Sequence, residues 1–452
     1  MILLFLILPF FAEASVQWQD VESNVLNNLP KLLSSRQKVI AQQGALKSAE
    51  GGFDHKIKAK TVNQFENTYD NQFHEIELSR QTKLMGSRLF LGQRQGTGFF
   101  PGYDEKYKTS SQGEIYAGLN LPVLRNLLTD EFRTNLEIER LELQIRKEQW
   151  RLDAIELLQK SFETYLKWIT VSEKLKIYQK LAEVAEMRQT FFEKKFKAGD
   201  VEAIKLTDNQ RSLSKRKAEL IKIEQEWEFV RRELSNYYPA VLNISIEKTP
   251  SIQTFAFETE DRLAKDSLPQ FKILNYELSQ IKQKTDYYHS QSLPELNIML
   301  EGSRDIGRSQ FVKDPDQLRV GLQIEIPLEN NKAEGGVTEQ RSKFKATEYQ
   351  FNWLSRLWQT QMDQIEVSIN KLRSLTSQVE IEVSSSEKMS EAERRKLAEG
   401  DGDLFVVNIR EQDEAKSKVK LYNTLKELNY YKFLKFSNSG QLAEKINMPL
   451  TQ

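Results

Sequence analysis

The chain has no cysteine, which excludes disulfide bridges, cysteine-ligated metals and thiol catalysis. It also has no excess of either charge, because Lys and Arg together number 65 and so do Asp and Glu. A neutral chain lacks the basic surface that nucleic acids require, so we expect no nucleic-acid partner. The histidines His55, His74 and His289 show no metal-ligand spacing, and no Ser-His-Asp set or carboxylate pair indicates catalysis. We therefore expect no enzyme, no metal site and no cofactor.

Long hydrophobic runs are missing after the N-terminus, where no segment approaches the ~20 apolar residues of a membrane-spanning helix. The apolar run Met1–Phe11 is too short to span a bilayer and is followed by Ala12-Glu13-Ala14, a cleavage pattern. Residues 1–14 are therefore predicted to be a signal peptide, and the mature chain to be exported. Such a chain could enter a membrane only as a closed β-barrel, because lipid leaves no partner for unpaired backbone groups.

Proline is absent from residues 123–238 and 328–448, and the only breaks expected in these stretches are Gly199 in the first and Gly400 and Gly402 in the second. Inside a helix, Pro costs about 3 kcal/mol and Gly about 1 kcal/mol relative to Ala. Each stretch therefore predicts a very long helix, a tight turn at the glycine and a returning helix. A helix of ~70 residues would be roughly 100 Å long, which suits a spacer or a tube wall.

The second long helix has apolar residues at every third or fourth position, as in helices that pack in a coiled coil. The seam consists of Phe351, Leu354, Trp358, Met362, Ile365, Ile369, Leu372, Thr376, Val379 and Val383.

A strand-like segment that ends in proline precedes each long helix, at Ile115–Pro122 and at Val320–Pro327. Apolar and polar residues alternate in both, and Pro294–Leu300 continues the pattern. This alternation suits a membrane barrel with a watery lumen, and it equally suits a half-buried sheet in a soluble protein. The apolar residues predicted to form the outer face of a barrel are Ile115, Ala117, Leu119, Leu121, Leu296, Ile298, Leu300, Val320, Leu322, Ile324 and Ile326.

Phe53–Phe65 is expected to be one more strand, and the polar, glycine-rich segment Asn67–Ser111 a long outward loop. Lys56, Lys58 and Lys60 would give a barrel lumen an anion preference if all three point inward.

Helix, strand, loop, strand with proline, long helix, glycine turn and returning helix occur twice in the same order, which predicts an internal duplication. The expected parts are a first repeat at 15–238, a linker at 239–260, a second repeat at 261–437 and a tail at 438–452. Four strands cannot close a barrel, for which about eight are the practical minimum. Several copies would have to pool their strands, and three copies would supply twelve.

The chain resembles the TolC-type outer-membrane efflux protein family over about Asp20–Ser437. The most specific motifs are Leu322–Leu328, which runs into a charged helix, and the paired turns Phe196–Asp200 and Leu397–Asp401. The resemblance implies a mostly α fold with a membrane β-barrel. Each protomer would supply a long coiled-coil helical tunnel and four strands, pooled as a twelve-stranded barrel in a homotrimer.

The resemblance also implies a passive exit duct of a tripartite efflux or type I secretion system. Such a channel lies in the bacterial outer membrane, extends into the periplasm, and docks on a periplasmic adaptor protein and an inner-membrane transporter. The resemblance identifies the periplasmic hairpin turns as candidate gate or adaptor contacts. It places them at Ala198, Gly199, Asp200, Gly400, Asp401, Gly402 and Asp403.

The positions of the family's acidic gate carry the apolar residues Val406, Val407 and Ile409 here, so an acidic gate is not predicted. Two interpretations of Asp401 and Asp403 stay open: an ion-sensing ring, or turn residues that cap the next helix. The main alternative for the whole chain is a soluble periplasmic coiled-coil adaptor or scaffold that bridges the two membranes. An adaptor normally has one helical hairpin per chain beside a lipoyl-like β domain, so the duplicated hairpins favour the channel.

Overall fold

The computed structural model describes residues 16–65, 69–257, 264–308 and 315–446. The predicted signal peptide lies outside these residues. The chain divides into two compact units. We call residues 1–36, 150–269 and 355–452 the helical unit, and residues 37–149 and 270–354 the sheet unit. Among the helices of the described residues, none combines the length and the hydropathy that crossing a bilayer needs.

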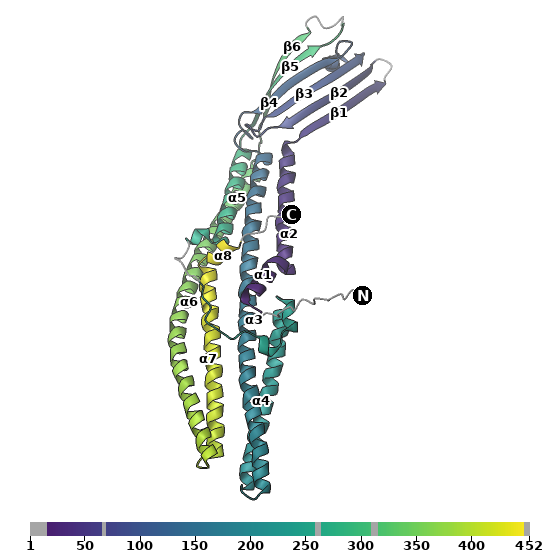
Figure 1. Ribbon diagram of the computed structural model, residues 1–452. Coiled ribbons are helices and arrows are strands. Elements are labelled where there is room, and N and C mark those ends of the chain that lie inside the picture. Colours follow the sequence, from purple (N-terminus) through teal and green to yellow (C-terminus); the bar gives the residue numbers. More distant parts are fainter. Residues whose placement is uncertain (1–15, 66–68, 258–263, 309–314, 447–452) are drawn as a thin grey trace, which may run out of the picture. The chain divides into compact units, whose positions relative to one another are not determined.

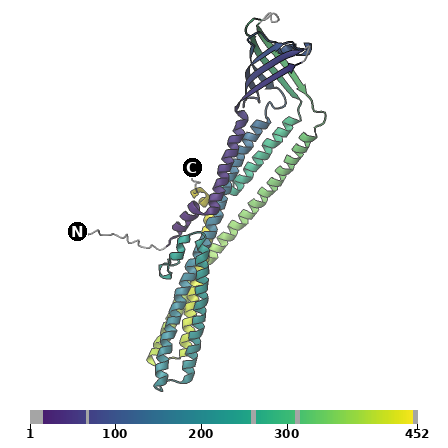
Figure 2. The same ribbon diagram turned by 90° about the vertical axis from the view of Figure 1, so that its right-hand side faces the viewer.

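The sheet unit contains one antiparallel sheet of six strands, which follow one another in sequence order across the sheet (Figure 1). Seen from the side, the sheet is curled, with β1 and β2 in front of β5 and β6 (Figure 2). The strands are β1 (His55–Phe65), β2 (Asp70–Gln81), β3 (Arg88–Gly98), β4 (Glu114–Pro122), β5 (Glu295–Asp305) and β6 (Asp316–Glu325).

The prediction of four strands per chain was wrong, because the segment expected to be a long outward loop contains β2 and β3. These two strands pair with each other and lie between β1 and β4. On β2, Ile76 and Leu78 alternate with charged and small residues, but on β3 Phe90 stands between Leu89 and Leu91 and interrupts the alternation. The many polar residues of these segments concealed the strand pattern in the sequence. Pairing with a neighbouring strand on both sides stabilises β2 and β3, whose conformation local propensity alone does not decide.

Four helices lead into or out of the strands. They are α2 (Pro30–Glu50), α3 (Glu131–Lys197), α5 (Pro269–Gln291) and α6 (Asn331–Glu399). Within the sheet unit, Gln42 of α2 donates a hydrogen bond from Nε2 to Oε2 of Glu139 in α3, at 2.5 Å. Gln280 of α5 donates to the carbonyl oxygen of Ile138 in α3, at 3.1 Å. These bonds hold together the ends of α2 and α5, which lead into β1 and β5, and the beginning of α3, which follows β4.

The helical unit confirms the predicted pattern of long helix, glycine turn and returning helix. The 67-residue α3 is followed by α4 (Ala203–Ser235), and the 69-residue α6 by α7 (Leu404–Asn438). Each pair runs side by side in both views (Figures 1 and 2). The first helical segment is divided at Leu29, since Pro30 cannot donate a backbone hydrogen bond, into α1 (Trp18–Asn28) and α2. A short α8 (Gln441–Lys445) lies in the expected tail.

An aromatic cluster forms the core of the helical unit. Phe162 of α3 is fully buried, and its ring centroid lies 4.4 Å from that of Phe433 in α7 and 4.8 Å from that of Trp18 in α1. Phe255 and Phe257, from the segment expected to be the linker, each lie 5.5 Å from Phe162. Aromatic pairs at such distances add about 0.5–1.5 kcal/mol each beyond the burial of their area. The cluster therefore joins segments that are far apart in the sequence, while the division into two repeats stays a prediction.

Candidate functional site

The strand register places the predicted outer-face residues on one face of the sheet. Leu119 lies opposite Leu300, which lies opposite Val320, and Leu121 is matched in the same way with Ile298 and Leu322. Ile326 directly follows the end of β6. The two unpredicted strands extend the same face with Ile76, Leu78, Leu89 and Leu91.

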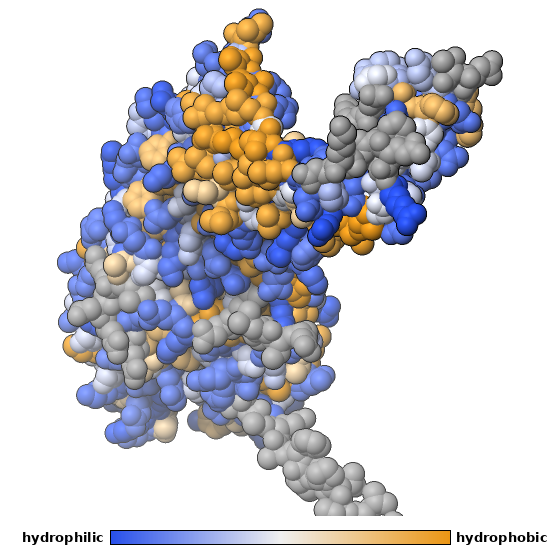
Figure 3. All heavy atoms as spheres, turned by 90° about the horizontal axis from the view of Figure 1, so that it is seen from above, coloured by the Kyte–Doolittle hydropathy of each residue, from blue (hydrophilic) through white to orange (hydrophobic). Residues whose placement is uncertain are grey.

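This apolar face is exposed. The exposed fractions are 77% for Leu318, 68% for Val320 and 65% for Leu322, and on β1 Ile57 reaches 77%. Figure 3, seen from above, shows hydrophobic side chains gathered in one broad patch. Exposed apolar surface costs about 25 cal/mol per Å² in water, and large patches mark contact with lipid or another protein. The face therefore requires a nonaqueous neighbour.

The opposite face of the sheet is polar and internally paired. Arg94 of β3 lies 2.5 Å from Glu114 of β4 and 2.9 Å from Glu301 of β5. Arg319 of β6 lies 2.7 Å from Glu301 and 3.0 Å from Glu114. The two arginines and two glutamates cancel in charge and tie four strands together through charge-assisted hydrogen bonds. The sheet thus has two faces of opposite chemistry, as a wall between lipid and water requires.

The lysines of β1 belong to the polar face. The register sets Lys56 opposite Ser79, Lys58 opposite Glu77 and Lys60 opposite Glu75. All three lysines therefore share the phase that an anion preference requires. Two of them face carboxylates on β2, which weakens the positive field they would produce. The anion preference stays a prediction.

Both predicted glycine turns have the same backbone geometry. Gly199 has φ +82° and Gly400 has φ +90°, values that favour glycine over residues with a Cβ atom. The amide of Asp200 donates to the carbonyl of Lys195 and that of Asp401 to the carbonyl of Lys396, each at 3.0 Å. Together with the bonds of the glycine amides, this is the Schellman pattern that ends a helix at a left-handed glycine.

The structure places the other predicted turn residues in the same two connections. Ala198 and Asp200 flank Gly199 after α3, and Gly402 and Asp403 precede α7. The side chain of Asp403 accepts a hydrogen bond from the amide of Phe405, at 3.0 Å, and so caps α7. This is the contact that the capping interpretation expects. An ion-sensing role of Asp401 and Asp403 remains a prediction.

Sequence reasoning missed a buried ion cluster in the helical unit. Glu411 of α7 accepts hydrogen bonds from Arg188 of α3, at 2.6 and 3.1 Å, and from Arg216 of α4, at 2.9 Å. Arg188 and Arg216 also reach Oδ1 of Asn408 in α7, at 3.0 and 3.4 Å. In the sequence, the one sign of this cluster is the position of Glu411, which lies four residues from Val407 and four from Ala415. Both of these apolar residues of α7 are buried, so Glu411 lies on the same buried face of the helix.

Burial alone would raise the pKa of Glu411, but the hydrogen bonds and charges of Arg188 and Arg216 outweigh it and lower this pKa below its ordinary value. Burial, together with the charge of Arg188, lowers the pKa of Arg216 despite the adjacent carboxylate. A guanidinium still remains charged at any physiological pH. The cluster is therefore ionised in the folded protein and links α3, α4 and α7.

No family model matches the sequence, and no curated protein is similar enough to count as a relative. Solved structures do match. The outer-membrane channel OprN aligns with a TM-score of 0.67 at 10% identity, over 94% of this chain and 89% of that one. The Campylobacter jejuni CmeC outer membrane channel gives 0.66 at 11% identity, over 96% and 90%. The open state of the Neisseria gonorrhoeae MtrE outer membrane channel gives 0.64 at 10% identity, over 94% and 89%.

The chain has the TolC-type channel fold. Likeness at these identities establishes the architecture. The chain differs from the family pattern described above in having two additional strands, β2 and β3, between the first strand and the one that ends at Pro122.

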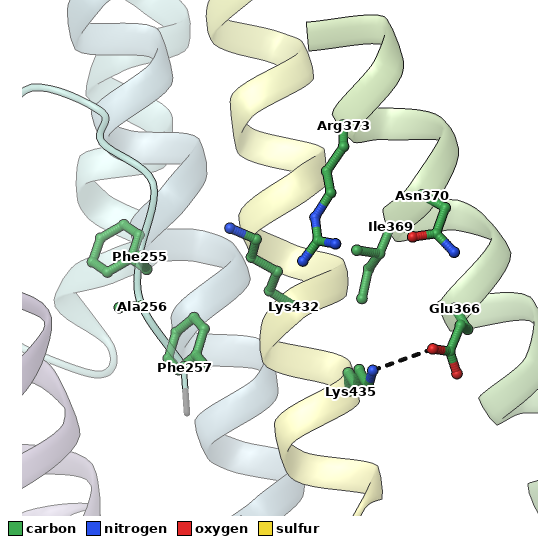
Figure 4. A pocket seen from close by; sticks show the side chains of 9 residues that line it. All are labelled: Phe255, Ala256, Phe257, Glu366, Ile369, Asn370, Arg373, Lys432 and Lys435. Atoms are coloured by element: carbon green, nitrogen blue, oxygen red, sulfur yellow. Dashed lines mark hydrogen bonds and ion pairs between the residues drawn. The ribbon is translucent and has the colours of Figure 1, made fainter. Parts of the chain in front are cut away.

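The helical unit of this channel fold also contains a small cavity of about 150 Å³ between α6, α7 and the segment that holds Phe255 and Phe257. Figure 4 shows Arg373 of α6 and Lys432 of α7 reaching into this space, while Lys435 lies 3.4 Å from Glu366. Burial, with the charge of Arg373, lowers the pKa of Lys432. A cavity of this size and charge has room for a few waters or one small anion. In the described part of the chain, no group of His, Asp or Glu is arranged to hold a metal ion.

Proposed function

We propose that this chain is an outer-membrane channel, the passive exit duct of a tripartite efflux or type I secretion system. The observation that carries the proposal is the exposed apolar face of a sheet whose other face is polar and ion-paired. A wall with these two faces separates lipid from an aqueous passage. The similarity of fold to outer-membrane channels supports the same conclusion.

We propose further that copies of the chain pool their sheets into one closed barrel. β1 and β6 are the edge strands of the sheet, and an unpaired edge cannot remain in lipid. Because six antiparallel strands alternate in direction, β6 of one copy runs antiparallel to β1 of the next. Copies can therefore join edge to edge through a heterologous interface, in which β6 of one copy pairs with β1 of the next. Repeating this interface closes the copies into a ring.

The strand count changes the size of the proposed barrel. The six-stranded sheets of three copies, the number that the TolC-type family uses, would together supply eighteen strands rather than twelve. Barrels of about 16–18 strands leave an aqueous channel. In this arrangement the helical unit belongs to the periplasm, where the turns at Gly199 and Gly400 are the candidate contacts for a periplasmic adaptor and, through it, an inner-membrane transporter.

The soluble adaptor or scaffold is the second candidate. A soluble protein would have to cover the apolar face of its sheet, and in the described residues most large side chains of this face stay exposed. The membrane channel therefore has the stronger support, and the proposal assigns no catalytic step to the chain.

The test is the native mass of the protein after detergent extraction of an outer-membrane fraction. We expect a species of three chains that resists extraction by salt and that opens conducting pores in planar bilayers. A monomer, or protein released from the membrane by salt alone, would contradict the channel and favour the scaffold. A stable dimer would keep the pooled barrel and reduce it to twelve strands.

A further inference from the structure

The connection between β3 and β4 folds back over the polar face of the sheet. We call this segment, Phe99–Gly113, the inward loop; it contains a short 3-10 helix at Gly102–Tyr107. It lies at the end of the sheet away from the helices, since β4 leaves this loop and ends at Pro122, shortly before α3. Phe100 and Ser110 are buried, with exposed fractions of 7% and 3%. A loop that merely projected into solvent would not bury these residues.

Contacts with three strands fix the inward loop on the polar face. On β2, the ring of Phe73 lies 4.8 Å from that of Tyr107, and Asn71 donates from Nδ2 to the carbonyl oxygen of Phe99, at 3.1 Å. On β5, Oδ1 of Asp305 accepts a hydrogen bond from the amide of Ser110, at 2.8 Å. The register sets Phe73, Asn71 and Asp305 on the same face as Glu75, Glu114 and Glu301.

The third strand contact is made at Gly96 of β3, and it requires glycine. A Cβ atom at this position would lie 1.8 Å from the carbonyl oxygen of Tyr107. The amide of Gly96 donates to Oγ1 of Thr109, at 3.1 Å, and the amide of Thr109 donates to the carbonyl of Gly96, at 3.4 Å. The backbone of the loop thus rests directly on the backbone of the strand, as close as two chains can approach.

We infer that the inward loop of each copy lies inside the barrel and sets the upper size limit of the solutes that leave through it. The inference rests on the proposed function, because the polar face lines a passage only if the sheets close into a barrel. Bulky segments that fold into a barrel narrow its lumen, and pore diameter then governs which solutes pass. Phe99 and Tyr103, with exposed fractions of 73% and 79%, are the large side chains that the loop presents to a passing solute.

Two variants release the loop in different ways. Gly96→Ala adds the methyl group for which there is no room, so the loop must move off the strand. A second variant replaces Pro101–Tyr107 by two glycines and leaves every strand residue in place. The matched control is Gly102→Ala in the same loop, because a Cβ atom there meets nothing within 4 Å.

The measurement is single-channel conductance of the full chain in planar bilayers, with polyethylene glycols of graded size to find the largest that enters the pore. We expect both release variants to raise the conductance, on the order of twofold, and to admit larger polymers, while the control behaves as the parent does. Native mass in detergent shows whether each variant still assembles. If Gly96→Ala fails to assemble, the conductance and the polymer limit of the shortened-loop variant test the inference.

The outcomes separate the two proposals. If the parent chain forms no pore at all, the proposed function fails and the inference falls with it. If the parent conducts and an assembled shortened-loop variant shows the same conductance and the same polymer limit, the channel stands and the role of the inward loop is refuted.

Discussion

Arg216 of α4 and Glu411 of α7 form an ion pair that is almost completely buried, with Nη2 and Oε2 2.9 Å apart and each side chain 2% exposed. Arg188 of α3 binds the other carboxylate oxygen of Glu411, at 2.6 Å. One carboxylate therefore pairs with two arginines, which leaves one net positive charge, and connects the first helical hairpin to the second. Such a cluster specifies which helices meet, because removing Glu411 leaves both arginines without their counter-charge.

We expect Glu411→Gln to destabilise the helical unit by about 3–5 kcal/mol, because the buried guanidinium of Arg216 and the largely buried one of Arg188 lose their counter-charge. The measurement is the unfolding of helical structure followed by circular dichroism in detergent. Glu186→Gln is the matched control: it breaks the exposed pair of Glu186 and Lys217, which also joins α3 to α4. The control should change stability by less than ~0.5 kcal/mol. Equal effects of the two substitutions would contradict the role assigned to burial.

The carboxylate of Glu411 should also make the stability of the protein depend on pH. The pKa of Glu411 is lowered in the folded protein, so the unfolded state takes up its proton first as the pH falls. The stabilisation is fully present above the ordinary pKa near 4.5 and is lost as the pH drops through the lowered folded value. We expect the unfolding free energy of the parent to fall more steeply in this acid range than that of Glu411→Gln. Parallel acid titrations would show that Glu411 is not the group responsible.

Replacing glycine by alanine should lower stability at the two turns and raise it within a helix. Gly199→Ala and Gly400→Ala place a Cβ atom on a left-handed residue, which costs about 1–2 kcal/mol although the space around both positions is open. Gly335→Ala, within α6 and equally open, should stabilise by up to ~1 kcal/mol. Thermal unfolding in detergent measures all three. Stabilisation by Gly400→Ala would show that its φ is not required.

A charge on the apolar face of the sheet should prevent membrane assembly. Leu322→Lys places an ammonium group where lipid is proposed, at a cost of about 2–4 kcal/mol near the bilayer centre. Gln323→Lys, the next residue, places the same charge on the polar face and should be tolerated. The fraction of protein recovered as an assembled species from outer membranes measures the difference. If both variants assemble equally well, the apolar face does not contact lipid.

Replacing Asp401 and Asp403 together by Asn separates the two interpretations of the second turn. Asn caps a helix about as well as Asp, so the capping interpretation predicts unchanged stability, conductance and cation block. An ion-sensing ring predicts that cation block weakens while the fold stays intact. Single-channel recordings with added divalent cations, together with a thermal unfolding curve, distinguish these results.

Much of the architecture could be predicted because it depends on local chemistry. The long helix expected before Gly199 in the proline-free stretch 123–238 is observed at Glu131–Lys197, and the strand expected to end at Pro122 does end there. The sites were less predictable. Arg188, Arg216 and Glu411 are ordinary charged residues in helices, and only the packing of three helices brings them together.

By itself, the sequence determined where the long helices run and where they turn. Helices continue where proline is absent and end at a left-handed glycine, and both effects reach only a few residues along the chain. It also determined that one face of the strands is apolar, because alternation has a period of two. Only the tertiary structure decided that β2 and β3 join the sheet and that the inward loop lies on its polar face. These features depend on pairings between residues distant in the chain, such as Ser110 with Asp305, which no local pattern encodes.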